Sequence, residues 1–156
     1  MLKTTVVMIA VVFVLSVVGA ARAEELFGIQ VYPGARKDAA ADKFCNMVDP
    51  SGKYAVCFRT SDTFEKVAAF YKKQANLKAG MHLASEGMSF AAFCPKGQDS
   101  CPGFTDGVDV TLNSPWSANV KMPPNAKAGD FENKDVRIRI YNKEAQMKQF
   151  NQKQSK

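Results

Sequence analysis

The sequence has a single histidine, His82, a single tryptophan and no cysteine pair of the C-x-x-C type. One histidine cannot build a histidine-rich metal site, and the four cysteines lack the paired short spacings of a zinc site. Without C-x-x-C or C-x-x-C-H, a thioredoxin-like redox motif and a c-type haem site are excluded. We therefore expect no metal and no cofactor.

The motifs that mark many catalytic or nucleotide-binding sites are also missing. There is no G-x-x-x-x-G-K-[ST] or G-x-G-x-x-G phosphate loop and no G-x-S-x-G elbow. The stretch 103–109 lacks the pattern of an EF-hand, and its Asp106 and Asp109 are expected to form a turn and a solvated strand face. The sequence thus predicts no catalytic residues, although carboxylates that converge only in the fold remain an alternative.

The one long apolar run lies at the N-terminus. Lys3 precedes the apolar stretch 6–18, which ends in small residues that include Ala21 and Ala23. This is the pattern of a cleavable signal peptide, and the run is short for a membrane span, which needs about 20 apolar residues. We expect cleavage after Ala23, with an uncleaved anchor as the alternative. The expected location is periplasmic or secreted, with no nucleic-acid partner and no stable membrane insertion after cleavage.

Length and charge set further bounds. Removal of the signal peptide 1–23 from the 156 residues leaves 133, the size of one ordinary domain. We expect a single domain over 24–142 and a polar tail over 143–156 that is frayed helix or disordered. Two of the 21 lysine and arginine residues leave with the signal, so 19 positive charges face 15 negative ones. This mild excess permits contact with anionic ligands without requiring it.

Four cysteines in a small exported domain predict two disulfides. Residues 43–48 and 53–59 look like two strands of a hairpin. With 50–52 as a three-residue loop, counting back along both strands places the first two cysteines opposite each other, close to disulfide range. The other two bracket a short polar turn. The predicted pairs are Cys45–Cys57 and Cys94–Cys101.

The periodicity of apolar residues predicts one main amphipathic helix and about six short strands. The helix is expected at about 62–76, because Asp62 and Glu65 have capping-box spacing and an apolar face follows; Gly80 marks a break, and 36–42 is expected to be a connection. Strands are expected at 27–32, 43–48, 53–60, 88–94, 108–112 and 136–141, with a brief one at 120–122. The predicted fold class is α+β with a mostly antiparallel sheet.

Part of the chain resembles a known pattern. Val31-Tyr32-Pro33-Gly34-Ala35 is followed by Thr60-Ser61-Asp62 and by V-A-A-F-Y-K-K over 67–73. Over about residues 29–77 this is similar to small secreted bacterial proteins of unassigned function with a YPGA…TxD…VxxFYKK pattern. The resemblance implies a bacterial periplasmic or secreted domain, and it implies no activity and no catalytic residues.

Surface chemistry supplies the remaining hint. Arg137, Arg139 and Tyr141 alternate along one predicted strand, so they point to the same side. Two guanidiniums and a phenol on one face suit an anionic group or a sugar. The alternative is the solvated face of an edge strand, where positive charge discourages sheet-to-sheet pairing.

Three functional hypotheses follow from these observations. The first is an exported, non-catalytic domain that binds an unidentified envelope protein or an anionic ligand. The second is an exported hydrolase with a carboxylate- or serine-based site. The third is a structural component of an envelope assembly.

Overall fold

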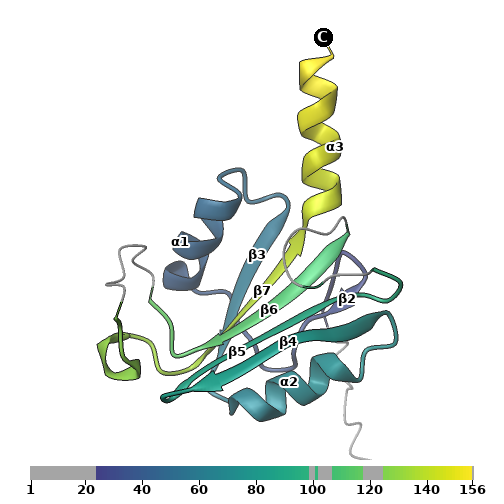
Figure 1. The fold of residues 1–156 in the computed structure, drawn as a ribbon. Helices are drawn as coiled ribbons and strands as arrows, with labels where there is room; N and C mark the ends of the chain where they lie inside the picture. The colour runs from purple at the N-terminus through teal and green to yellow at the C-terminus, as the bar shows by residue number, and fades with distance from the viewer. Residues whose placement is uncertain (1–23, 99–100, 102–106, 118–124, 156) are drawn as a thin grey trace, which may run out of the picture.

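A five-stranded antiparallel sheet organises the computed structural model, which describes residues 24–98, 101, 107–117 and 125–155 (Figure 1). The strand order is β3-β7-β6-β5-β4, and every neighbouring pair is antiparallel. The strands are β3 (Ala55–Thr60), β4 (Leu77–Ser85), β5 (Met88–Pro95), β6 (Val108–Ser114) and β7 (Val136–Asn142). The predicted α+β class with a mostly antiparallel sheet is confirmed.

Helices and a small hairpin surround this sheet. The short strands β1 (Glu25–Leu26) and β2 (Ile29–Gln30) pair only with each other. The helices are α1 (Ala39–Val48), α2 (Phe64–Lys72), the 3-10 turn η1 (Ala128–Asp130) and α3 (Lys143–Gln154). Figure 1 shows that α3 projects away from the sheet. Among the described residues, no helix has both the length and the apolar character needed to cross a lipid bilayer.

The main hydrophobic core lies between α2 and one face of the sheet, which we call the core face. Alternate residues of the strands point into it because side chains alternate between the two faces of a strand. In β7 these are Val136, Ile138 and Ile140, all buried. Tyr71 of α2 is also buried, and its hydroxyl accepts a hydrogen bond from the backbone N–H of Tyr32 at 3.2 Å. This contact joins the N-terminal segment to the same core.

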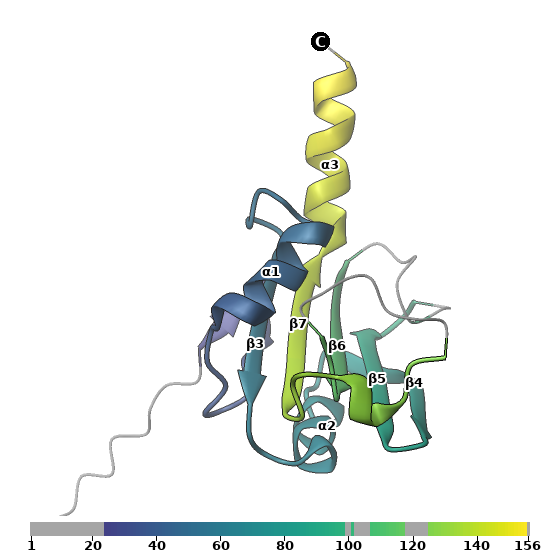
Figure 2. The same ribbon diagram turned by 90° about the vertical axis from the view of Figure 1, so that its left-hand side faces the viewer.

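The prediction of a strand over 43–48 is wrong: these residues belong to helix α1, which lies beside β3 and β7 (Figure 2). Asp38 caps the helix, since its side chain accepts the N–H of Ala40 at 3.0 Å. Three alanines at 39–41, strong helix formers, follow the cap. The predicted hairpin loop is therefore a helix-to-strand connection, and the part of 36–42 from Ala39 onward is helix.

The side chain of Asp49 shapes that connection. It is 1% exposed and accepts hydrogen bonds from the backbone N–H groups of Ser51, Tyr54 and Ala55 at 2.5 to 3.1 Å. Burial alone would raise the pKa of Asp49, but these bonds and that of the Ser51 hydroxyl outweigh burial and lower it. The Asp49 carboxylate thus ties the end of α1 to the first residue of β3 through hydrogen bonds.

Helix α2 is shorter than predicted, and a strand was missed after it. Its N-cap is Thr63, which accepts the N–H of Lys66, while Asp62 instead accepts a hydrogen bond from the Tyr32 hydroxyl at 2.7 Å. The predicted break at Gly80 lies inside β4. A Cβ atom at Gly80 would lie 2.5 Å from the Cβ of Cys101, so the absence of a side chain allows this close approach.

The remaining expectations are met to different degrees. The strands predicted at 53–60, 88–94, 108–112 and 136–141 correspond to β3, β5, β6 and β7. The strand predicted at 27–32 is reduced to β2, and most of the polar tail forms α3. The strand predicted at 120–122 lies outside the described residues.

Candidate anion-binding face

The opposite face of the sheet carries a cluster of charged and polar side chains. Register fixes their arrangement: Arg137 of β7 lies between Arg59 of β3 and Asn113 of β6, and Arg139 lies between Cys57 and Thr111. Tyr141 follows, opposite Asp109. We call this the polar face; it comprises Arg59, Asp109, Thr111, Asn113, Arg137, Arg139 and Tyr141.

The three predicted ligand-binding residues, Arg137, Arg139 and Tyr141, are therefore neighbours on one face. Their setting differs from the alternative interpretation, because β7 lies between β3 and β6 and is not an edge strand. The side chains are also less exposed than a solvated face would make them: Arg137 is only 6% exposed.

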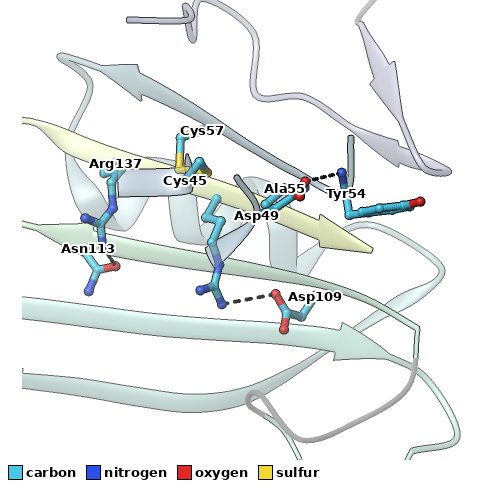
Figure 3. Close-up of a disulfide and its surroundings, with 9 residues drawn as sticks. Cys45, Asp49, Tyr54, Ala55, Cys57, Asp109, Asn113 and Arg137 are labelled. Carbon is cyan, nitrogen blue, oxygen red and sulfur yellow. Dashed lines mark hydrogen bonds and ion pairs between the residues drawn. A yellow bond between two sulfur atoms is a disulfide. The ribbon is translucent and has the colours of Figure 1, made fainter. Parts of the chain in front are cut away.

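Arg137 is enclosed by aromatic and amide groups. Its guanidinium carbon lies 3.4 Å from the ring centroid of Phe44 on α1 and 5.5 Å from that of Trp116. One terminal nitrogen donates to Oδ1 of Asn113 at 2.7 Å (Figure 3). The Nε atom is buried without a hydrogen-bond partner. No carboxylate of the described residues lies within ion-pair distance of Arg137.

Burial without a counter-charge perturbs this guanidinium. Burial first, and the positive charge of Arg139 second, lower the pKa of Arg137 to about 10. Arg59, its direct neighbour on β3, shows the reverse: the hydrogen bond to Asp135, at 2.5 Å, raises the pKa of Arg59. Asp38 adds a second carboxylate 3.4 Å from Arg59. The pKa values of these two adjacent arginines thus shift in opposite directions, because Arg59 has carboxylate partners and Arg137 has none.

Arg139 is intermediate between these two cases. Its terminal nitrogen lies 3.5 Å from Oδ1 of Asp109, a long ion pair, and its Nε is buried without a hydrogen-bond partner. Asp109 is 3% exposed rather than on the solvated strand face expected from the sequence. Burial raises the pKa of Asp109, and the charge of Arg139 opposes that rise. The Tyr141 hydroxyl donates to Gln146 of α3.

The predicted Cys45–Cys57 disulfide is present, but it joins α1 to β3 instead of two strands of a hairpin. The Cα atoms of its cysteines are 5.8 Å apart, within the range that a disulfide requires. Figure 3 shows the bond close to Arg137 on the polar face. Because Cys45 is adjacent to Phe44, the bond also fixes the helix segment that stacks on Arg137.

Cys94 and Cys101 carry thiols in the structure rather than a disulfide. The two side chains interact directly: burial first, and a hydrogen bond with Cys94 second, raise the pKa of Cys101 to about 12. Part of the loop between them lies outside the described residues. The Cys94–Cys101 bond therefore stays a prediction, now supported by the proximity of the two side chains.

Other residues singled out in the sequence lie elsewhere. His82 is in β4, on the core face, where its ring centroid is 5.7 Å from that of Phe64. Asp106 is outside the described residues. Sequence reasoning missed the contacts of Phe44 and Trp116 with Arg137, since these contacts depend on α1 and on the segment that follows β6.

Comparison with known proteins yields no relative: no protein-family model matches the chain, and neither the curated proteins nor the solved structures include a significant match.

Proposed function

We propose that the chain is an exported, non-catalytic binding domain that holds an anionic group of its ligand at Arg137 and Arg139. The observation that carries this proposal is the buried, unpaired charge of Arg137. A buried charge costs considerable free energy unless it is paired. A carboxylate, phosphate or sulfate placed beside both guanidiniums would supply the missing counter-charge.

The hydrogen-bonding capacity of the site favours such a group. Arginine presents a planar fork of N–H donors that matches carboxylate and phosphate geometry. The Nε atoms of Arg137 and Arg139 are both buried without acceptors, so each arginine has an N–H donor to which an oxygen atom of the ligand could bind. Arg139 has 16% of its side chain exposed, and we place the approach of the ligand at this residue.

Two further features agree with a preformed binding site in an exported protein. The signal-peptide pattern of residues 1–23 predicts an oxidising destination, where the Cys45–Cys57 bond would persist. That bond holds α1 against β3 and thereby holds Phe44 over Arg137. Preorganisation of this kind lowers the ordering cost of binding.

The test is a ligand titration of the chain from Glu24 onward, which contains the whole described hydrophobic core. Thermal unfolding is followed with phosphate, sulfate, citrate and a neutral sugar at constant ionic strength, since general screening must be separated from binding. Binding to the folded state stabilises it by about 2.7 kcal/mol at 100 times Kd. We expect at least one anion to stabilise the protein and the neutral sugar to have no effect.

Matched variants locate the effect. Arg137→Gln and Arg139→Gln should each remove most of the response to the anion. Arg36→Gln should keep it, because Arg36 has the same charge but is exposed and lies outside the polar face. An equal response in all three variants, or no anion response in the unmodified protein, would contradict the proposal.

A further inference from the structure

The outer edge of the sheet at β4 is unusual in being long, exposed and uncharged. All residues from Ala79 to Ser85 are exposed, and none of them carries a formal charge at neutral pH when His82 is neutral. β4 ends the strand order, so no described strand pairs with its outer side (Figure 1). Exposed edges of this kind are templates for pairing with another strand.

Two large apolar side chains stand on this edge. Met81 is 41% exposed and Leu83 is 56% exposed, the highest value among the large hydrophobic residues of the described chain. Leu83 pairs with Phe90, which is out of phase with the core residues Ala91 and Phe93, so Leu83 points to the polar face of the sheet.

Strand geometry defines where a partner can pair. The register of β4 with β5 is interrupted between Ala79 and His82, so the regular part of the strand is His82–Ser85. The hairpin closes at Ser85 and Met88, and hydrogen bonding in antiparallel pairs alternates from residue to residue. His82 and Ala84 therefore direct their backbone N–H and C=O groups to the outer edge.

We propose that a second copy of this chain pairs antiparallel with β4, on a two-fold axis at Leu83, so that the two sheets become one continuous sheet. In this register His82 of each copy hydrogen-bonds with Ala84 of the other, and the two Leu83 side chains are direct neighbours. Met81 of each copy flanks them. The pairing uses the regular half of the strand and covers its exposed apolar residues.

Charge at the two ends of β4 favours this occupant. Lys78 is the second residue of β4 and Glu86 follows the strand, and the two side chains have opposite signs. The Lys78 ammonium also donates a hydrogen bond to the backbone carbonyl of Gln98. Antiparallel self-pairing brings Lys78 of each copy close to Glu86 of the other. A parallel arrangement would instead place like charges together, which destabilises a sheet.

The other edge of the sheet argues for a closed pair rather than an extended fibre. At β3, Arg36 forms an isolated bridge with Arg59, with backbone hydrogen bonds of 2.9 and 3.0 Å. This bridge occupies one end of the β3 edge. Isologous pairing through β4 alone closes on a dimer.

The first experiment measures mass in solution by light scattering after size exclusion over a range of concentrations. We expect a monomer–dimer equilibrium that Leu83→Lys shifts to monomer, while circular dichroism and the unfolding midpoint stay close to those of the parent because Leu83 is exposed. A parent protein that is monomeric at every concentration, or a dimer that Leu83→Lys leaves intact, overturns the proposal.

Two further variants test the register. Leu83→Cys should form a disulfide between copies spontaneously, since residues on the axis have Cβ atoms about 4.5–5.5 Å apart; Ala69→Cys, exposed on α2, should not. Glu86→Lys should weaken the dimer by a factor on the order of 2 to 30, because each contact occurs twice. Adding Lys78→Glu should restore it. Equal crosslinking of both cysteine variants, or no rescue by the charge exchange, overturns this register.

Discussion

Replacing Arg137 by methionine is expected to stabilise the unliganded domain. In the folded state burial lowers the pKa of this guanidinium from its ordinary value to about 10, and such a shift corresponds to about 3 kcal/mol of cost for the charged form. Because a lowered pKa of a base penalises its protonated form, this cost is present in full at every pH below about 10. The cost decreases only as the pH rises above about 10, towards the ordinary pKa of arginine.

The substitution also removes favourable contacts, and these reduce the gain. The hydrogen bond to Asn113 at 2.7 Å contributes about 1 kcal/mol. The stacking on Phe44 contributes on the order of 1 kcal/mol, part of which a methionine side chain retains. The expected net result is a free energy of unfolding about 1 kcal/mol higher than that of the parent at neutral pH.

Arg59→Met is the matched control, because Arg59 is the same residue type and lies directly opposite Arg137 on the neighbouring strand. Its loss leaves Asp135 without its 2.5 Å partner, so we expect a decrease of about 2 kcal/mol in the free energy of unfolding. Urea unfolding at neutral pH, followed by circular dichroism and by the fluorescence of the single tryptophan, Trp116, measures both changes. A loss of more than about 1 kcal/mol in Arg137→Met would refute the reasoning that Arg137 lacks a counter-charge.

Three other outcomes can be measured on the same protein. Asp49→Asn should lower the free energy of unfolding by about 2 to 3 kcal/mol at neutral pH, since a carboxylate that accepts several hydrogen bonds is lost; because the pKa of Asp49 is lowered by folding, the difference from the parent should shrink as the pH falls below about 4. Replacing both Cys45 and Cys57 by alanine should cost about 3 kcal/mol, as the chain-entropy model gives for a separation of 12 residues, and equal denaturation midpoints for variant and oxidised parent would contradict it. Non-reducing peptide mapping of exported protein should recover a Cys94–Cys101 peptide, and a dominant link from either residue to Cys45 or Cys57 would overturn the pairing.

β6 and β7 were located because one face of each strand meets the hydrophobic core and the other carries polar groups, whereas β5 was located as a short apolar run. β7 is the clearest case, because its apolar residues Val136, Ile138 and Ile140 alternate with two arginines. This two-residue period indicates a strand and also shows which side chains face the core. The same alternation placed the candidate ligand residues together. It could not state their burial, because the neighbours of β7 are set by topology rather than by local pattern.

Two elements escaped prediction for different physical reasons. Helix α1 was mistaken for a strand although Asp38 before three alanines is a helix-start signal; the apparent hairpin geometry between Cys45 and Cys57 outweighed it. β4 contains Gly80 and no β-branched residue, so its local propensity for strand is low. Its pairing with β5 through a two-residue turn, with Glu86 and Gly87 both at positive φ, forms the strand instead.

The Cys45–Cys57 bond was predicted correctly, but from a hairpin that the structure replaces with α1 and β3. The bond therefore has a different structural role from the one expected. A bond across a hairpin would stabilise two strands that already pair, whereas the observed bond attaches α1 to β3 at Cys57, the position opposite Arg139. Phe44 of α1 stacks on Arg137, so loosening the helix would expose that guanidinium to water and remove the penalty of its burial. Reduction of Cys45–Cys57 should therefore weaken the response to anions in protein that is still folded. An anion response that is unchanged after reduction would show that α1 does not contribute to anion binding at the proposed site.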